Sequence, residues 1–362
     1  MSSQTTSSQP TSSQPTLKDV AERAGVSYQT VSKVLRKEKR VTPETLKRIE
    51  KAVAELDYRP NVAARSLRTR TTRLIGYSWN PTKLNEINPI LEQFLNSVVN
   101  AAATLGYRLL LFPYDVGQDW LSSYQELILS NHVDAFILSE VEYEDPRVAH
   151  LQEMKASFVA FGHCDAPAPF SYVDVDNRQG GRMVTEHLLA QGHRKIAALA
   201  WPETSRIGAE RLAGYREALH KAGIEVDPAT VVRGAGTYQS GYDCASHLLD
   251  LPVERRPTAF VTMVDTMAIG AVHAAQQRGL RIGPDIGITG FDDTPIIQHL
   301  KPSLTSVRQP IAKVGEALVE LLSGILQGDT PADSHVLLAP SLSVRESSLR
   351  HKPEYSDGQS TR

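Results

Sequence analysis

The spacing of apolar residues changes at about residue 74. Between residues 17 and 57 apolar side chains recur three and four positions apart, the period of one face of an α-helix. From residue 74 onward short apolar runs alternate with amphipathic helical stretches. The first pattern predicts a small helical bundle. The second predicts an α/β region in which parallel strands carry helices on both faces.

Two short helices follow a tail of Ser, Thr, Gln and Pro (residues 1–15) that we expect to be disordered. The apolar stripe of the first helix consists of Leu17, Val20, Ala21 and Ala24. Gly25 ends this helix, because glycine adopts the left-handed cap conformation without steric cost. Ser27 caps a second helix, whose stripe is Val31, Val34 and Leu35. Two short helices joined by such a turn have the sequence form of a helix-turn-helix.

A third helix begins at Pro43, because Thr42-Pro43 is the pattern of a cap followed by proline at the first helical position. We expect it to extend to about residue 57 and to end before Pro60, since the residue preceding proline disfavours the helical region. Its core-facing residues are predicted to be Leu46, Ile49, Val53 and Leu56.

In a helix-turn-helix the second helix enters the major groove of DNA and its first residues reach the base edges. The polar residues there, predicted to point away from the stripe, are Ser27, Tyr28, Gln29, Ser32 and Lys33. A helical bundle without a DNA partner is the alternative, and charge argues against it. Residues 16–73 hold 15 Lys and Arg against 7 Asp and Glu, a net charge of +8, whereas residues 74–362 carry −10. A basic module on an acidic body indicates a phosphate-rich partner.

The run from Asp19 through Val26-Ser27 to Ser32, together with Tyr58-Arg59-Pro60-Asn61, Ala64-Arg65-Ser66-Leu67 and Ile75-Gly76, resembles the lactose-repressor (LacI/GalR) family of bacterial transcription regulators. The resemblance implies contacts with a double-stranded DNA operator. The residues it assigns to these contacts are Thr16, Leu17, Ser27, Tyr28, Gln29, Thr30, Ser32, Lys33, Arg36, Asn61, Ala64, Arg65 and Leu67. It also implies that residues 61–67 form a hinge helix in the operator's minor groove, with Leu67 as an apolar wedge between base steps. A plain linker is the alternative for this segment, since so short a helix is marginal in water.

The α/β region is predicted to hold two subdomains, because more than 200 residues of alternating strands and helices exceed one doubly wound sheet. Strands are expected at residues 74–77, 107–112, 135–138, 157–161, 172–175, 196–200, 259–262 and 286–289. Helices are expected at residues 90–105, 120–129, 179–191, 209–222, 240–249 and 266–278. The resemblance implies a core like that of periplasmic sugar-binding proteins, with chain crossings near Asp174, Ser306 and His335. The fold class is therefore α/β: a three-helix headpiece and hinge helix, then a two-subdomain core of doubly wound parallel sheets.

Open parallel sheets bind ligands beyond the carboxyl ends of their strands, which here means the cleft between the subdomains. By resemblance, the effector-binding residues are Ser139, Arg211 at a helix start, Asp292 and Gln309 at a crossing. Tyr238 is added as a residue expected to stack on the ligand in place of an aromatic residue that the family commonly has two positions earlier. Two alternatives remain: Arg211 and Asp292 pair only with each other, or Asp292 or Asp293 caps the following turn. The chain departs from the family at Val264, a position often Asn, at Gly236, where an aromatic residue is common, and at Ile90-Leu91, which replace the usual aromatics. These departures leave the identity of a sugar open.

Nothing in the sequence marks a catalytic, metal or cofactor site. Cys164 and Cys244 are far apart, and the histidines, among them His187, His193 and His273, lack metal-ligand spacing and are expected at helix surfaces or turns. His163-Cys164 is not expected to act as a nucleophile pair, because adjacent strand residues point to opposite faces. No apolar run approaches the ~20 residues that span a membrane.

We therefore expect a homodimeric transcription regulator, a repressor by resemblance, that binds a palindromic operator and responds to a small effector, a sugar or related metabolite. The expected parts are a headpiece (residues 16–58), a hinge and linker (59–73), an effector-binding and dimerisation core (74–349) and a disordered tail (350–362). It would act in the bacterial cytoplasm, associated with the nucleoid. Effector identity, induction or corepression, and dimer or tetramer stay open. The competing classes are a small-molecule binding protein with a basic tether, and an enzyme.

Overall fold

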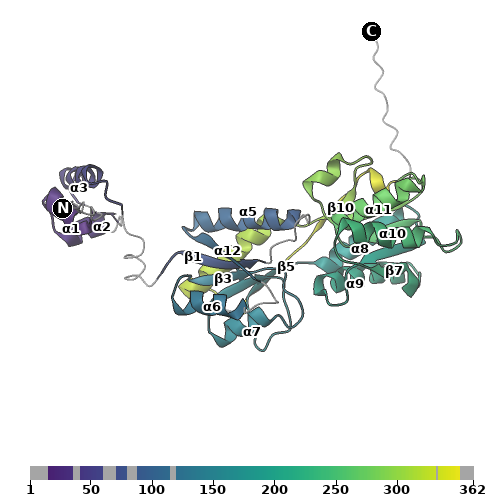
Figure 1. Cartoon of the computed structure of the whole chain (residues 1–362), viewed down its shortest axis with the longest axis horizontal. Helices are drawn as coiled ribbons and strands as arrows, with labels where there is room; N and C mark the ends of the chain where they lie inside the picture. Colours follow the sequence, from purple (N-terminus) through teal and green to yellow (C-terminus); the bar gives the residue numbers. More distant parts are fainter. Residues whose placement is uncertain are drawn as a thin grey trace, which may run out of the picture. The chain divides into compact units, whose positions relative to one another are not determined.

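The computed structural model forms two compact units, Met1–Thr72 and Arg73–Arg362 (Figure 1). The structure describes residues 15–35, 41–59, 71–79, 88–114, 120–331 and 333–350. The expected hinge helix at 61–67 and the expected tails at 1–15 and 350–362 lie outside or almost outside these residues.

The first unit contains three helices, α1 (Leu17–Ala24), α2 (Tyr28–Leu35) and α3 (Pro43–Glu55). Gly25 has the left-handed φ of 63° that the turn requires, as the sequence predicts. The core of this unit consists of Val20, Ala21, Ala24, Val31, Val34, Ile49, Ala52 and Tyr58. Two predictions about this core are wrong. Leu46 is 39% exposed because the packed face of α3 runs through Ile49 and Ala52, and Leu35 is 37% exposed at the end of α2.

The second unit contains two six-stranded sheets, and each belongs to one subdomain. The first sheet has the order β11-β5-β4-β3-β1-β2 and is parallel throughout. Its strands are β1 (Leu74–Trp79), β2 (Arg108–Pro113), β3 (Ala135–Leu138), β4 (Phe158–Phe161), β5 (Tyr172–Val175) and β11 (His335–Leu338). One face packs against α5 (Pro89–Thr104) and α12 (Ile311–Gln327), and the other against α6 (Trp120–Leu129) and α7 (Pro146–Glu153) (Figure 1).

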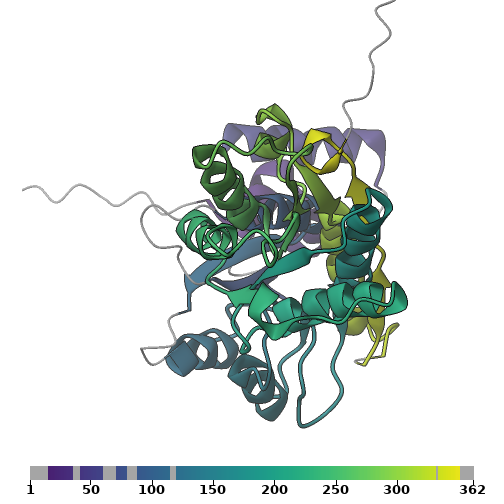
Figure 2. The ribbon, with the colours of Figure 1, turned by 90° about the vertical axis from the view of Figure 1, so that its right-hand side faces the viewer.

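The second sheet has the order β12-β10-β9-β8-β6-β7, in which only β12 is antiparallel to its neighbour. Its strands are β6 (Ile196–Ala200), β7 (Val231–Arg233), β8 (Ala259–Thr262), β9 (Gly287–Asp292), β10 (Thr305–Arg308) and β12 (Ser341–Ser343). Helices α8 (Asn177–Ala190) and α9 (Arg206–Lys221) cover one face, and α10 (Tyr238–Leu249) and α11 (Asp265–Gln277) cover the other. Figure 2 looks toward this subdomain, with the two helix pairs on either side of the strands. Short 3-10 helices at Pro228–Thr230, Pro295–His299 and Glu346–Ser348 complete the subdomain.

The chain crosses between the subdomains three times: from β5 into α8, from β10 into α12, and from β11 into β12. The crossings expected near Asp174 and Ser306 lie within a few residues of the observed ones. The third, expected near His335, also lies within a few residues: His335 begins β11, an edge strand paired with β5, and the chain leaves the sheet after Leu338. The predicted architecture of two doubly wound sheets is confirmed.

Candidate functional site

The helix-turn-helix presents its polar residues to the surface on one side of α2. Tyr28, Gln29 and Lys33 are exposed. Ser27 Oγ accepts a hydrogen bond from Thr30 N at 3.2 Å and lies 2.8 Å from Thr30 Oγ1, so the serine caps α2 as predicted. Ser32 is different: it is only 5% exposed, because it lies between Val31 and Val34 near the packed side of the short helix. The prediction that its side chain faces away from the core is wrong.

Thr16 and Leu17 begin α1, where both also have structural roles. Asp19 Oδ2 accepts hydrogen bonds from Thr16 N at 2.7 Å and from Thr16 Oγ1 at 2.8 Å. These hydrogen bonds lower the pKa of the Asp19 carboxyl, so the cap is charged and complements the helix N-terminus. Leu17 is half-buried against the headpiece core. The other residues expected to contact DNA, Arg36, Asn61, Ala64, Arg65 and Leu67, lie outside the described residues.

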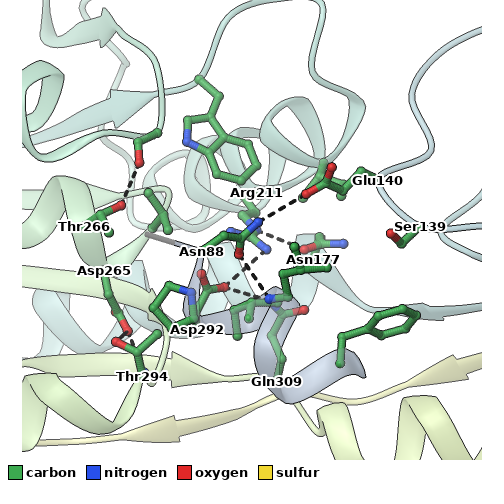
Figure 3. Close-up of a pocket in the computed structure, with 18 of the residues that line it drawn as sticks. Asn88, Ser139, Glu140, Asn177, Arg211, Asp265, Thr266, Asp292, Thr294 and Gln309 are labelled. Atoms are coloured by element: carbon green, nitrogen blue, oxygen red, sulfur yellow. Dashed lines mark hydrogen bonds and ion pairs between the residues drawn. The ribbon is translucent and has the colours of Figure 1, made fainter. Parts of the chain in front are cut away.

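A cavity of about 1000 Å³ lies between the two subdomains (Figure 3). All five residues expected to bind an effector line it: Ser139, Arg211, Tyr238, Asp292 and Gln309. They meet there because β3 and β9 end at the cleft, Gln309 occupies the crossing after β10, and α9 and α10 begin beside it. The structure therefore brings together residues up to 170 positions apart in the chain.

Arg211 lies in the second turn of α9, one turn beyond the helix start expected for it, and is 4% exposed. Its Nε donates to Asn177 Oδ1 at 2.9 Å (Figure 3), and its Nη1 donates to the Met263 carbonyl at 2.5 Å. Its guanidinium carbon lies 3.5 Å from the centre of the Phe291 ring. Burial lowers the pKa of Arg211 to about 10, which still leaves it charged at neutral pH.

Arg211 and Asp292 do form an ion pair, but a loose one. Arg211 Nη2 lies 3.8 Å from Asp292 Oδ1, and Gln309 Nε2 donates to the same oxygen at 2.7 Å. Both partners line the cavity, so pairing and ligand contact are compatible. Asp292 also has a φ of 111°, a left-handed conformation that is rare for a residue with a side chain. Such strain at a cleft is typical of a functional position.

The turn after β9 is held by Asp265, and neither Asp292 nor Asp293 caps it. Asp265 Oδ2 accepts hydrogen bonds from Thr294 N at 2.7 Å and Thr294 Oγ1 at 2.9 Å, and Oδ1 accepts one from Ser306 Oγ at 2.6 Å. Burial raises the pKa of Asp265, and the nearby Asp292 charge raises it further. Burial likewise raises the pKa of Asp292, against the lowering effect of Arg211.

Ser139 and Tyr238 differ in exposure. Ser139 is 6% exposed and its hydroxyl lies 2.6 Å from the Tyr77 hydroxyl. The loop that carries Ser139 is held by the buried pair of Arg147 and Asp145, since Arg147 Nη2 also donates to the Ser139 carbonyl at 2.9 Å. Tyr238 is 40% exposed, and its hydroxyl is hydrogen-bonded to His273. It therefore lies at the rim of the cavity.

Several further residues of the cavity were not identified from the sequence. They are Asn88, Glu140, Asn177, Trp201, Asp265 and Thr266. Asn88 Nδ2 donates to Glu140 Oε1 at 3.3 Å (Figure 3). Trp201 follows β6 directly, so its position after a buried strand was a readable signal. Asp265 also follows a predicted strand closely, at the start of α11, but its hydrogen bonds with Thr294 and Ser306 join residues remote in sequence and had no such signal.

A second polar cluster joins the two subdomains next to the cavity. Asp174 of the first subdomain accepts a hydrogen bond from Arg206 Nη2 of the second at 2.9 Å. His163 Nδ1 lies 2.8 Å from Asp174 Oδ2, and its Nε2 lies 3.0 Å from Arg206 Nη1. Glu142 accepts hydrogen bonds from Arg206 N at 2.6 Å and Ser205 Oγ at 3.1 Å at the start of α9. We call these five residues the clasp, since their hydrogen bonds hold the subdomains together.

Within the described residues no group of three or more His, Cys, Asp or Glu side chains is arranged to hold a metal ion. Among the helices there, none combines the length and apolar character needed to cross a bilayer. His163 and Cys164 are engaged separately, the histidine in the clasp and the cysteine at a half-buried site where burial raises its thiol pKa. His193 follows α8 in a turn, as expected, but it is fully buried.

Two family models match the chain. Residues 16–61 match the family described as "Bacterial regulatory proteins, lacI family", and residues 185–348 match "Periplasmic binding protein-like domain". The chain is 36% identical over 340 residues to the HTH-type transcriptional regulator CelR of Thermobifida fusca, an alignment that covers 91% of this chain and 97% of CelR.

Solved structures of transcription regulators are also similar to this chain. A regulatory protein of the LacI family from Chloroflexus aggregans is 48% identical, with a TM-score of 0.73, and the match covers 77% of this chain and 99% of that one. A complex of the transcriptional regulator CelR with cellobiose is 32% identical, with a TM-score of 0.71 and coverage of 92% and 99%. The lac repressor dimer bound to operator and the anti-inducer ONPF is 30% identical, with a TM-score of 0.80 and coverage of 93% and 100%.

The relatives are transcription regulators, so the chain is not an enzyme. Three findings support one assignment. They are the capped helix-turn-helix, the two mainly parallel sheets, and the match to CelR over nearly its full length. The chain belongs to the LacI family of bacterial regulatory proteins and is a DNA-binding transcription regulator.

Proposed function

We propose that the protein is a repressor that binds a nearly palindromic operator as a homodimer and is controlled by an uncharged sugar in the cavity. The observation that carries the proposal is that one chain holds a helix-turn-helix with exposed Tyr28, Gln29 and Lys33 and a polar cavity between two subdomains. A dimer with two-fold symmetry presents two such helices, and its target then has two matching half-sites.

The side chains that line the cavity favour a neutral ligand. Among the described residues that line it, the acidic and basic side chains are four carboxylic acids, Glu140, Asp174, Asp265 and Asp292, and one guanidinium, Arg211. A phosphate group entering this space would face more negative than positive side chains. Carboxylate and amide oxygens accept hydrogen bonds from hydroxyl groups, and Arg211 and the amide nitrogens donate to them. The relative CelR has been solved with cellobiose, a neutral disaccharide.

The proposed regulatory step depends on the three chain crossings between the subdomains. A ligand that contacts both subdomains favours one angle between them, and this angle sets the spacing of the two chains that lead to the headpieces of a dimer. Residues 61–67, as paired hinge helices, would then form or melt together on the operator. Leu67 is the proposed wedge in the minor groove, and Arg65, Arg68 and Arg70 are proposed to hold phosphates. The protein would act on DNA in the bacterial cytoplasm.

A gel-shift assay with a palindromic and a scrambled duplex tests the proposal, with and without cellobiose, lactose, maltose and glucose. We expect preference for one palindrome and a change in affinity with one sugar. Gln29→Ala should weaken operator binding by about 1–3 kcal/mol at one base position and leave the fold intact, because Gln29 is exposed. Leu67→Ala should reduce discrimination and leave nonspecific binding in place. Equal loss of both would contradict the wedge, and no preference for any duplex would contradict the proposal.

A further inference from the structure

Trp201 brings a large aromatic surface to the cavity. It follows β6, is half-buried, and packs against the apolar clusters on both faces of the second sheet. The other aromatic residues that line the cavity are Phe94, Phe161 and Tyr238. Phe94 and Phe161 stack on each other with ring centres 5.4 Å apart, and Tyr238 lies at the rim. Trp201 is thus the aromatic side chain that the second subdomain contributes from its interior.

Gly236 provides the space that the Trp201 indole occupies. A Cβ atom at position 236 would lie 3.0 Å from Trp201 Nε1, 3.4 Å from Cε2 and 3.5 Å from Cζ2. The first distance is closer than normal van der Waals contact, so a side chain there would displace the indole. Gly236 is itself held in place, because its carbonyl accepts a hydrogen bond from Thr266 Oγ1 at 2.6 Å.

The indole has an unused hydrogen-bond donor. Trp201 Nε1 is buried and has no hydrogen-bond partner among the described residues. An unpaired buried donor is costly, and native proteins usually satisfy such groups. Ala235 and Gly236 line the same cavity, and position 236 is next to this nitrogen, so the unpaired N–H lies at the cavity wall.

Trp201 is also linked to the polar centre of the cavity. The Arg211 guanidinium carbon lies 5.2 Å from the centre of the Trp201 ring and belongs to the group that pairs with Asp292. A pyranose ring has hydroxyl groups around its edge and an apolar face of C–H bonds. An aromatic surface next to hydrogen-bonding side chains matches both parts of such a ring.

We propose that Trp201 is the platform on which the sugar ring stacks, and that Gly236 is a specificity-determining residue because it sets the position of the indole. This inference rests on the proposed function. It adds to that function a residue and a ligand feature: a pyranose with an open C–H face. A linear polyol, which has no such ring face, should bind more weakly than a pyranose.

The experiment uses the full-length protein. The chain has three tryptophans, Trp79, Trp120 and Trp201, and the first two do not line the cavity, so the W79F/W120F variant leaves Trp201 as the only indole fluorophore. Calorimetry first identifies which of cellobiose, lactose, maltose, glucose and sorbitol binds the wild type. The same sugar should then change the Trp201 emission at the concentrations that saturate the heat signal.

Three variants locate the contact. Trp201→Ala should weaken sugar binding about tenfold or more, and Trp201→Phe less, since phenylalanine keeps a smaller ring and loses the N–H. Gly236→Ala should weaken binding several-fold with near wild-type Tm. Trp120→Phe is the matched control and should bind as the wild type does. If Trp201→Ala does not fold, the sugar affinity of Trp201→Phe and the change in Trp201 emission decide whether Trp201 contacts the sugar.

The two proposals fail differently. If a sugar binds the wild type but neither the Trp201 emission nor the affinity of the Trp201 variants changes, the platform is wrong and the sugar-responsive function stands. Stronger binding of sorbitol than of every pyranose also overturns the platform. If no sugar in the panel binds the wild type, the platform and the sugar ligand are both wrong.

Discussion

Arg206 Nη2 donates to Asp174 Oδ2 at 2.9 Å, and this contact joins the two subdomains across the crossing from β5 to α8. Both side chains are almost completely buried, with 5% and 2% of their surfaces exposed. Arg206 also pairs with Glu210 at 2.5 Å in its own helix. The arginine therefore has charged partners in both subdomains, Asp174 in the first and Glu210 in the second, and we expect the arrangement of the subdomains to depend on it.

Asp174→Asn is expected to lower the free energy of unfolding by about 2 kcal/mol or more, because it leaves the buried Arg206 with only Glu210 as a charged partner. Urea-induced unfolding measures this change. Glu186→Gln is the matched control: Glu186 pairs with Lys221 on the surface at 3.3 Å, and its replacement should leave the midpoint almost unchanged. Equal midpoints for Asp174→Asn and the wild type would contradict the role assigned to the clasp.

Arg211→Lys is expected to weaken binding of the sugar about tenfold or more, while DNA binding without sugar persists. Lysine keeps the charge, but it cannot lie flat on Phe291 and donate to Asn177 and the Met263 carbonyl together. Calorimetry measures the affinity. Arg278→Lys is the control, since Arg278 pairs with Asp250 and does not line the cavity. Unchanged affinity in Arg211→Lys would place the ligand elsewhere.

The sequence predicted those strands and helices whose apolar pattern can be recognised without knowledge of the rest of the fold. The bounds of the helix α6 and of the strands β3, β5, β6 and β8 agree with the prediction. Burial on both faces makes these four strands mostly apolar runs, which are easy to recognise. Strands β11 and β12 were missed, since both are edge strands with partly exposed side chains. Strand β7, which has only three residues, and β10, whose sequence is mostly polar, were missed as well. Helices α7 and α12 were also missed, although the apolar stripe of α12 is regular.

The cavity was predicted less completely than the fold. Resemblance and strand ends located Ser139, Arg211 and Asp292, which all line it. Neither identified the clasp or the hydrogen bonds of Asp265, because these join residues that only the folded chain brings together. The burial of Ser32 and Leu46's exposure likewise depend on how three short helices pack, which a periodic stripe determines only to within one position.

His193 predicts how stability depends on pH. The ring is fully buried, Nδ1 lies 3.0 Å from Thr258 Oγ1, and burial lowers the pKa of His193 to about 4, with Arg350 and His187 adding to the effect. The unfolded chain therefore binds a proton that the folded chain does not between pH 4 and 6.5. Protonation of His193 alone should lower the free energy of unfolding by about 1.4 kcal/mol for each pH unit between 6.5 and 4.

His193→Asn should make this decrease smaller, because asparagine can retain the hydrogen bond to Thr258 but has no proton to gain in this range. Buried Asp265 and Asp292 act in the opposite direction: their raised pKa values stabilise the protein at low pH and lose that contribution as pH rises through them. Unfolding in urea from pH 4.5 to 8, compared between the wild type and His193→Asn, separates the two effects. The variant removes the contribution of His193 and keeps the contributions of both aspartates. His132→Asn, at an exposed histidine, is the control. An unaltered slope in His193→Asn would show that another group titrates there.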